Sequence, residues 1–151
     1  MTADWHGYSP VVIPVLDALA ELGFQVFLAT PGHGRIPPMV IFGAPAELGN
    51  LLRRRLCSAY EGGDLELSTR WEIDEHLTPT YTLVRSYLPH LTPFRLEPLV
   101  DPLDPSLDCS AVERTREDLA PLGEFLRHAL DDLHGWHDWF IRLHEQRGHS
   151  T

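Results

Sequence analysis

The 151-residue sequence predicts an α+β fold, a two-layer sandwich in which helices flank an antiparallel sheet of four to five strands and a long helix ends the chain. Three observations lead to this prediction. Residues 24–43 contain two apolar runs joined by a turn rich in glycine and proline. Residues 65–73 alternate between apolar and polar side chains, and apolar residues recur at helical spacing in three other stretches. Elements in this order favour a sheet covered by helices.

The first helix is predicted close to the N-terminus. Ser9 followed by Pro10 is typical of a helix cap and first turn, and Gly23 ends the apolar periodicity. Because a proline inside a helix costs ~3 kcal/mol, Pro14 leaves a second possibility, in which the helix begins only at Pro14.

A hairpin is predicted over residues 24–43. Its two apolar runs, 24–29 and 39–42, suit strands that are covered on both faces or lie in the centre of a sheet. The eight residues from Pro31 to Pro38 are too few for the crossover that a parallel pair requires. We therefore expect an antiparallel pair with its turn at these residues.

A second helix is predicted after the hairpin, opening at Ala44 and Pro45 and ending at Gly62 and Gly63. Its apolar stripe consists of Leu48, Leu52, Leu56 and Ala59. The basic cluster Arg53–Arg55 lies beside this stripe. An acidic partner could meet this cluster, but we favour contacts within the molecule or with solvent.

Two further strands are expected in the middle of the chain. Residues 65–73 should form a strand with one buried and one wet face. Residues 80–88 favour a strand that pairs back on 65–73, although Thr78 and Pro79 could equally cap a short helix.

The C-terminal part is predicted to be a proline-rich connection followed by a long helix. Five prolines interrupt residues 89–105, so we interpret 89–109 as a connection in which only 94–100 could pair, at an edge of the sheet. Ser110 and Glu113 have the spacing of a capping box, and the helical pattern continues nearly to Arg147, divided at Pro121. Its apolar stripe consists of Leu122, Leu126, Ala129, Leu133, Trp136, Phe140 and Leu143.

Composition limits the class of protein. The length suits a single domain spanning residues 1–151. No apolar run approaches the roughly 20 residues that span a bilayer, so we expect no membrane contact and a cytoplasmic location. The net charge is −10, and the excess lies in residues 61–151, which hold eighteen acids against eight arginines, whereas residues 1–60 hold four of each. This charge disfavours nucleic-acid binding.

No cofactor is predicted from the residue patterns. Cys57 and Cys109 are too few and too far apart for a disulfide framework, so we expect reduced thiols, with Cys57 in the core. At the hairpin tip, the glycine-flanked His33 and the nearby Arg35 could bind an anion; a mobile turn is the alternative. A dinucleotide fingerprint is not supported, since Gly43 and Gly49 lack its spacing.

A histidine-rich stretch in the last helix is a candidate metal site. His134 and His137 lie three residues apart, with His144 and Asp138 near them, which is compatible with a divalent metal. Ordinary helix-surface pairs, such as His134 with Asp138, explain the same pattern. The enzyme hypothesis, a metal-dependent hydrolase, rests on these residues.

The leading hypothesis is a protein-interaction module without catalytic activity, such as an adaptor, chaperone or inhibitor. Its acidic C-terminal half would hold a basic or amphipathic protein partner, through Asp131, Asp132, Asp138 and an edge-exposed Trp139. The breadth of the last helix's apolar surface and the unpaired edge strand after Pro93 also predict a homodimer. No residue motif names the partner.

Overall fold

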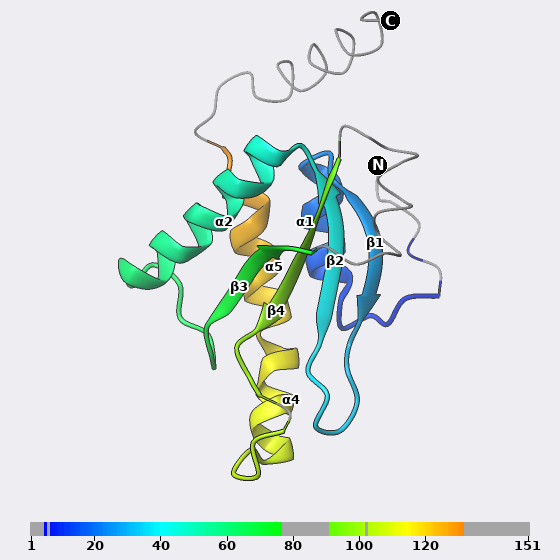
Figure 1. Cartoon of the computed structure of the whole chain (residues 1–151), viewed down its shortest axis with the longest axis vertical. Coiled ribbons are helices and arrows are strands. Elements are labelled where there is room, and N and C mark those ends of the chain that lie inside the picture. The colour runs from blue at the N-terminus through cyan, green and yellow to red at the C-terminus, as the bar shows by residue number, and fades with distance from the viewer. Residues whose placement is uncertain (1–4, 6, 77–90, 102, 132–151) are drawn as a thin grey trace, which may run out of the picture.

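The computed structural model describes residue 5 and residues 7–76, 91–101 and 103–131. In chain order the elements are α1 (Ile13–Glu21), β1 (Gln25–Thr30), β2 (Met39–Ala44), α2 (Ala46–Glu61), β3 (Trp71–Glu75), β4 (Thr92–Pro98), α4 (Cys109–Glu117) and α5 (Leu119–His128). The strands form one antiparallel sheet in the order β1-β2-β4-β3 (Figure 1). Helices α1 and α5 pack against each other, and α2 packs along β3. The predicted α+β fold is confirmed.

One apolar core lies between the sheet and the helices. Alternate residues of β2, β3 and β4 point into it, as side chains of a pleated strand do. On β2 these include Val40 and Phe42, which stand opposite Leu96 and Phe94 of β4. The ring of Phe42 stacks on Phe94 and on Phe24, with centroids 5.7 Å and 5.9 Å apart. The pair β2–β4 is therefore the centre of the fold.

The predicted hairpin is present, but only one of its strands is buried. β1 pairs antiparallel with β2, and the turn lies between them at residues 31–38, as predicted. β2 is almost entirely buried, whereas Gln25 and Leu28 of β1 are exposed. The expectation that both strands are covered is wrong for β1, because β1 forms an edge of the sheet.

Strand β4 lies in the middle of the sheet, so the prediction of an edge strand at 94–100 is wrong. Pro93 and Pro98 are tolerated because they occupy the second and last positions of β4, which leaves the N–H groups of residues 94–97 for the two ladders. Both sides of β4 are paired, with β2 and with β3. A homodimer built on unpaired backbone after Pro93 therefore loses that part of its basis.

Strand β3 begins later than predicted. Residues 65–70 lie outside the ladder, although Leu65 and Leu67 still pack on the core. The backbone there is held by other groups: the Ser68 amide donates to Asp118 Oδ1 at 2.9 Å, and the Trp71 amide donates to a tyrosine hydroxyl in α2. These bonds replace ladder bonds up to the start of β3. The predicted strand at 80–88 lies outside the described residues.

Helix α1 and helix α5 approach each other closely. α1 begins at Ile13 with Val12 as its N-cap, so Pro14 lies in the first turn, where a missing N–H breaks no helical bond. Of the two predicted starts for this helix, the one at Pro14 is correct to within one residue. A Cβ atom added at Gly123 of α5 would lie 2.5 Å from the Pro14 carbonyl oxygen. The packing of the two helices therefore requires glycine at this position.

Helix α2 has the predicted extent and buried stripe. The prediction that Cys57 lies in the core is wrong: its side chain is only partly buried, and its Sγ lies 3.0 Å from Nη2 of Arg70, on the flank of α2 that faces the start of β3. Cys57 and Cys109 are both free thiols.

The C-terminal helix is divided near Pro121, as predicted. α4 ends and α5 begins at Asp118, which places Pro121 in the first turn of α5, where proline is tolerated. The cap of α4 differs from the prediction, because Asp108 rather than Ser110 accepts a bond from the Ala111 amide, at 2.8 Å. α5 ends at His128 and residues 129–131 form a turn, so the prediction that the helix continues without a break is wrong at this point. The rest of the predicted continuation toward Arg147 lies outside the described residues.

Candidate protein-interaction surface

The turn between β1 and β2 is a built structure. His33 and Ile36 exchange both backbone hydrogen bonds, at 3.0 Å and 2.9 Å. Gly32 has a φ of 75°, and a Cβ atom there would collide with the Ile36 carbonyl. Glycine at this position thus allows the turn to close tightly.

Helix α4 holds this turn through one arginine. The Arg116 side chain is 12% exposed, and its Nε donates to the Pro31 carbonyl at 2.8 Å. Its Nη2 donates to the Ile36 carbonyl at 3.4 Å, while Nη1 pairs with Glu113 at 2.6 Å. Charge-assisted bonds of this kind are stronger than neutral ones. The hairpin tip is therefore anchored to α4.

A second arginine joins the tip to the connection before α4. The Arg35 guanidinium donates to the Asp104 carbonyl, so residues 33–36 and 99–108 lie at the same end of the molecule (Figure 1). His33 and Arg35, the predicted anion site, are both exposed there. Anion binding by these two residues remains a prediction.

Aspartates fix the backbone of residues 99–108. Asp101 accepts from the Leu103 amide at 2.9 Å, and Asp104 accepts from the Ser106 amide and hydroxyl at 2.9 Å and 2.8 Å. The bonds from Ser106 hold the pKa of Asp104 below its usual value, and the bonds from Ser110 and Ala111 do the same for the pKa of Asp108. Both carboxylates are therefore charged at neutral pH.

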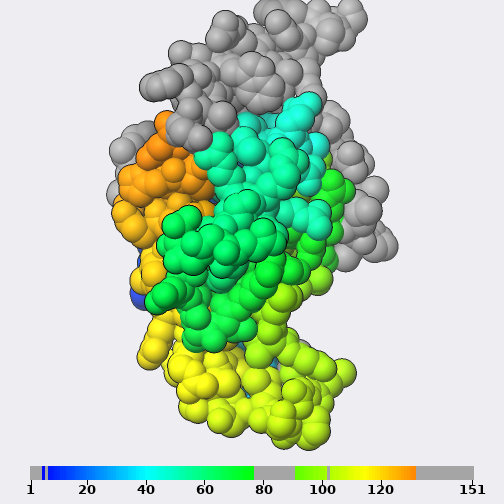
Figure 2. Space-filling view, turned by 90° about the vertical axis from the view of Figure 1, so that its left-hand side faces the viewer, coloured from blue at the N-terminus to red at the C-terminus, as the bar shows by residue number. Residues whose placement is uncertain are grey.

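Three exposed apolar side chains lie in these two segments, 33–36 and 99–108. Leu103 is 88% exposed, Ile36 61% and Leu99 49%, which makes them the three most exposed large apolar residues of the described part. Asp101, Asp104 and Asp108 lie in the same connection, and no arginine does. We name Ile36, Leu99, Leu103 and these three aspartates the tip surface; residues 99–108 protrude at the lower end of Figure 2.

Three of the four acidic side chains on β3 and β4 have arginine partners. On β3, Asp74 pairs with Arg53 at 3.0 Å and Glu72 with Arg70 at 3.7 Å. On β4, the two residues Arg95 and Glu97 pair at 3.1 Å.

The arginine cluster of α2 is used within the molecule, as we favoured from the sequence. Arg53 pairs with β3, and Arg55 Nη1 donates to the Ala129 carbonyl at the end of α5, at 2.8 Å. Since this end of a helix carries unpaired carbonyls and partial negative charge, Arg55 stabilises the end of α5.

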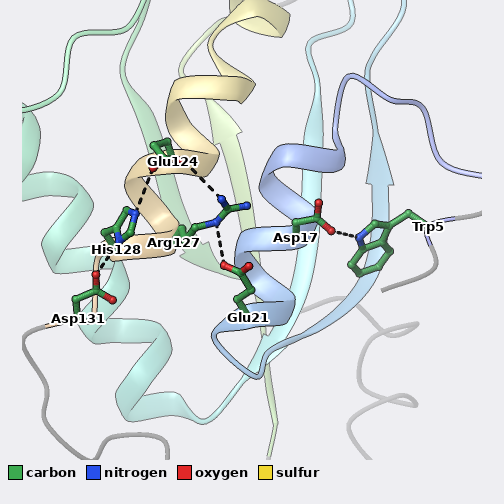
Figure 3. A network of polar contacts seen from close by, with 7 residues as sticks. All are labelled: Trp5, Asp17, Glu21, Glu124, Arg127, His128 and Asp131. Atoms are coloured by element: carbon green, nitrogen blue, oxygen red, sulfur yellow. Dashed lines mark hydrogen bonds and ion pairs between the residues drawn. The ribbon is translucent and has the colours of Figure 1, made fainter. Parts of the chain in front are cut away.

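One of the predicted partner-binding residues, Asp131, belongs to a polar network at the end of α5 (Figure 3). His128 contacts Asp131 Oδ2 through Nδ1 at 2.7 Å and Glu124 Oε1 through Nε2 at 3.2 Å. The hydrogen bond with Asp131 is the main cause that raises the pKa of His128. Arg127 links the same turn to α1 through Glu21, at 2.9 Å. Asp131 is exposed but already has a partner within the chain.

The other predicted site residues lie outside the described residues. These are the partner-binding residues Asp132, Asp138 and Trp139 and the metal ligands His134, His137 and His144. Within the part that the structure describes, no three His, Cys, Asp or Glu side chains form a group that could hold a metal ion. The metal site and the metal-dependent hydrolase remain hypotheses from the sequence.

Sequence reasoning missed the apolar residues of the tip surface. Leu99 and Leu103 lie in a segment that we interpreted as a connection, and Ile36 lies between Arg35 and Pro37 in a turn. The available signal was a large apolar residue in a turn-rich stretch without periodic neighbours. Such residues are either buried under a loop or displayed, and the sequence does not distinguish the two.

Comparison of the chain with protein-family models, curated proteins and solved structures found no match. Among the described helices, none combines the length and apolar character needed to cross a membrane.

Proposed function

We propose that the chain is a protein-interaction module that holds a basic, amphipathic segment of a partner on the tip surface. The observation that carries the proposal is the 88% exposure of Leu103 on a backbone fixed by Asp101 and Asp104. Displaying an apolar side chain in water is unfavourable, and its burial by a partner contributes affinity.

The surroundings of Leu103 suit a partner with positive charge. The aspartates of the tip surface form an acidic rim, and acidic rims steer basic partners and select among them. Because Arg35 and Arg116 already hold the tip in place, little ordering of the backbone would accompany binding. The tip surface is therefore preorganised for binding, with a small entropic cost of ordering its backbone.

In this proposal the partner binds the tip surface, whereas the sequence analysis predicted that it binds the last helix. Asp131 is hydrogen-bonded to His128, whereas the tip surface combines exposed apolar side chains with three exposed aspartates. Participation of Asp132, Asp138 and Trp139 stays a prediction from the sequence.

The test uses a labelled synthetic helix with one leucine face and one arginine face as the probe, titrated by fluorescence anisotropy. Leu103→Ser should weaken binding about tenfold, the loss expected for a central apolar contact. Leu28→Ser is the matched control, because Leu28 is 41% exposed but lies on β1, away from the 99–108 connection.

The acidic rim is tested separately. Asp101→Asn and Asp104→Asn retain a side-chain oxygen that can accept the bonds from Leu103 and Ser106 while removing the charge. The double variant should slow association, and Glu66→Gln, an exposed acid elsewhere, should not. Equal binding by wild type, Leu103→Ser and the double Asn variant would exclude the tip surface as the binding site.

A further inference from the structure

A hollow between α2 and α5 is the second feature of the surface that could receive a partner. It has a volume of about 570 Å³, within the range of ~300–1,000 Å³ that binding sites occupy. Its apolar lining includes Leu51 and Ala59 of α2 and Phe125 of α5. In Figure 2 the end of α5, in orange, lies beside α2, far from the protruding residues 99–108.

The charged lining of the hollow is mainly cationic. Arg54, Arg55 and His128 line it, together with Asp64. Glu124 and Asp131, which contact His128, offset the charge of its ring, so the positive charge of the lining comes from the two arginines. Both ring nitrogens of His128 face carboxylates, and a neutral imidazole has only one N–H to donate, so this geometry favours the doubly protonated cation. Arg55 is held at the wall by its bond to the Ala129 carbonyl. Arg54 and Arg55 are of the opposite sign to the aspartates of the tip surface.

We propose that the tip surface of one copy of the chain inserts into this hollow on a second copy, head to tail. The proposal rests on the proposed function, because it names a second copy as a partner of the tip surface. Leu103 would enter against Leu51 and Phe125, and Asp101 and Asp104 would approach Arg54 and Arg55. Apolar and charged groups are thus complementary across the two surfaces.

The arrangement of the two surfaces requires two copies. Residues 99–108 lie at one end of the molecule, and α5 runs away from them toward α2 (Figure 1). The residues that line the hollow come mainly from α2 and the end of α5. The contact joins two different surfaces, so it is heterologous and would close into a ring or continue as a chain. This differs from the symmetric homodimer that the sequence suggested.

The test uses sedimentation velocity on the full chain and two variants. Leu103→Asp damages the tip surface and leaves the hollow intact, whereas Arg54→Glu does the reverse. Both positions are exposed, so both variants should fold, which circular dichroism checks. Wild type should associate, and each variant alone should be monomeric, with at least a tenfold weaker association.

Mixing the two variants is the decisive step. An equimolar mixture should form dimers and nothing larger, because only one tip and one hollow remain functional. In a second mixture, Ser58→Tyr takes the place of Arg54→Glu, because it fills the hollow without changing its charge. This mixture should also form dimers and nothing larger. Leu28→Asp should associate like wild type.

Three results would overturn the head-to-tail contact: a monomeric wild type at high micromolar concentration, variants that associate like wild type, or a mixture that remains monomeric. If the wild type is monomeric but still binds the leucine–arginine helix through Leu103, the proposed function stands and only this inference fails. If the mixture dimerises but the helix does not bind, the tip surface is specific for its own chain.

Discussion

The buried carboxylate of Asp118 is predicted to be the polar group whose removal destabilises this fold most. Asp118 is 6% exposed and stands at the junction of α4 and α5. It accepts three hydrogen bonds: from the Ser68 amide at 2.9 Å, the Ser68 hydroxyl at 2.6 Å and Trp71 Nε1 at 3.1 Å. No ion pair of Asp118 is present within the described residues. Its stabilising effect therefore comes from hydrogen bonds alone.

The magnitude follows from what Asp118→Ala leaves behind. Trp71 is 1% exposed, so its indole N–H would be buried without an acceptor, which costs about 1–3 kcal/mol. Ser68 is exposed and can bond to water instead, so its two lost bonds add about 1 kcal/mol. We expect Asp118→Ala to lower the free energy of unfolding by about 2–4 kcal/mol. Asp118→Asn, which retains one acceptor oxygen, should lower it by about 1–2 kcal/mol.

Urea unfolding followed by tryptophan fluorescence measures these changes. Asp108→Ala is the control, because Asp108 is an exposed N-cap that shares the acid chemistry but contacts no buried donor; its loss should cost about 1 kcal/mol. If Asp118→Ala were as stable as Asp108→Ala, or within about 0.5 kcal/mol of wild type, the inferred role of the buried network would be wrong.

Three further predictions concern packing and protonation. Trp71 and Ile41 are both 1% exposed, so Trp71→Ala and Ile41→Ala should each lower the free energy of unfolding by about 3–5 kcal/mol. Phe27→Ala, on the edge strand β1, should lower it by only about 1–2 kcal/mol. Equal losses for the three variants in urea unfolding would contradict the strand order. Gly123→Ala should cost about 1–3 kcal/mol, because its Cβ would press on the Pro14 carbonyl, and an unchanged unfolding midpoint would refute this contact. Asp131 raises the pKa of His128 above 6.5, so the interaction between them stabilises the fold below pH 6.5, and this stabilisation is lost as the pH rises through the raised pKa. The melting temperature should therefore depend less on pH between pH 5.5 and 8 in His128→Asn than in the wild type. An identical pH profile for the two proteins would show that the pair is not coupled to folding.

The parts of the fold that the sequence predicted correctly are those with a local signal. The turn at 31–38 and the ends of α2 follow from proline and glycine positions, which act within a few residues. Pro14 and Pro121 predicted helix boundaries because a missing N–H is tolerated only in a first turn.

The incorrect parts depend on which strands become neighbours. The apolar run of β1 resembles that of β2, and only the strand order shows that β1 is an edge. The five prolines of residues 89–105 suggested an edge for β4, but the two that lie in the strand, Pro93 and Pro98, are close to its ends and permit a central place. Asp118 carried no signal in the sequence, because its three donors come from a segment about fifty residues earlier.

The candidate site could be predicted only in part. The sequence located the acidic excess and directed attention to His33 and Arg35, which lie at the tip. It did not predict that Arg116 would join the tip to α4 or that Arg35 would join it to residues 99–108, because these contacts link positions about seventy to eighty-five residues apart. The tip surface therefore could not be predicted from the sequence, because these long-range contacts are what bring its segments together.

Hydrogen exchange with and without the leucine–arginine helix tests most directly whether the tip surface is the binding site. Binding should slow exchange at backbone amides of residues 33–36 and 99–108, and leave β1 unchanged. Protection confined to α2 and α5, with unchanged exchange at 33–36 and 99–108, would contradict the account.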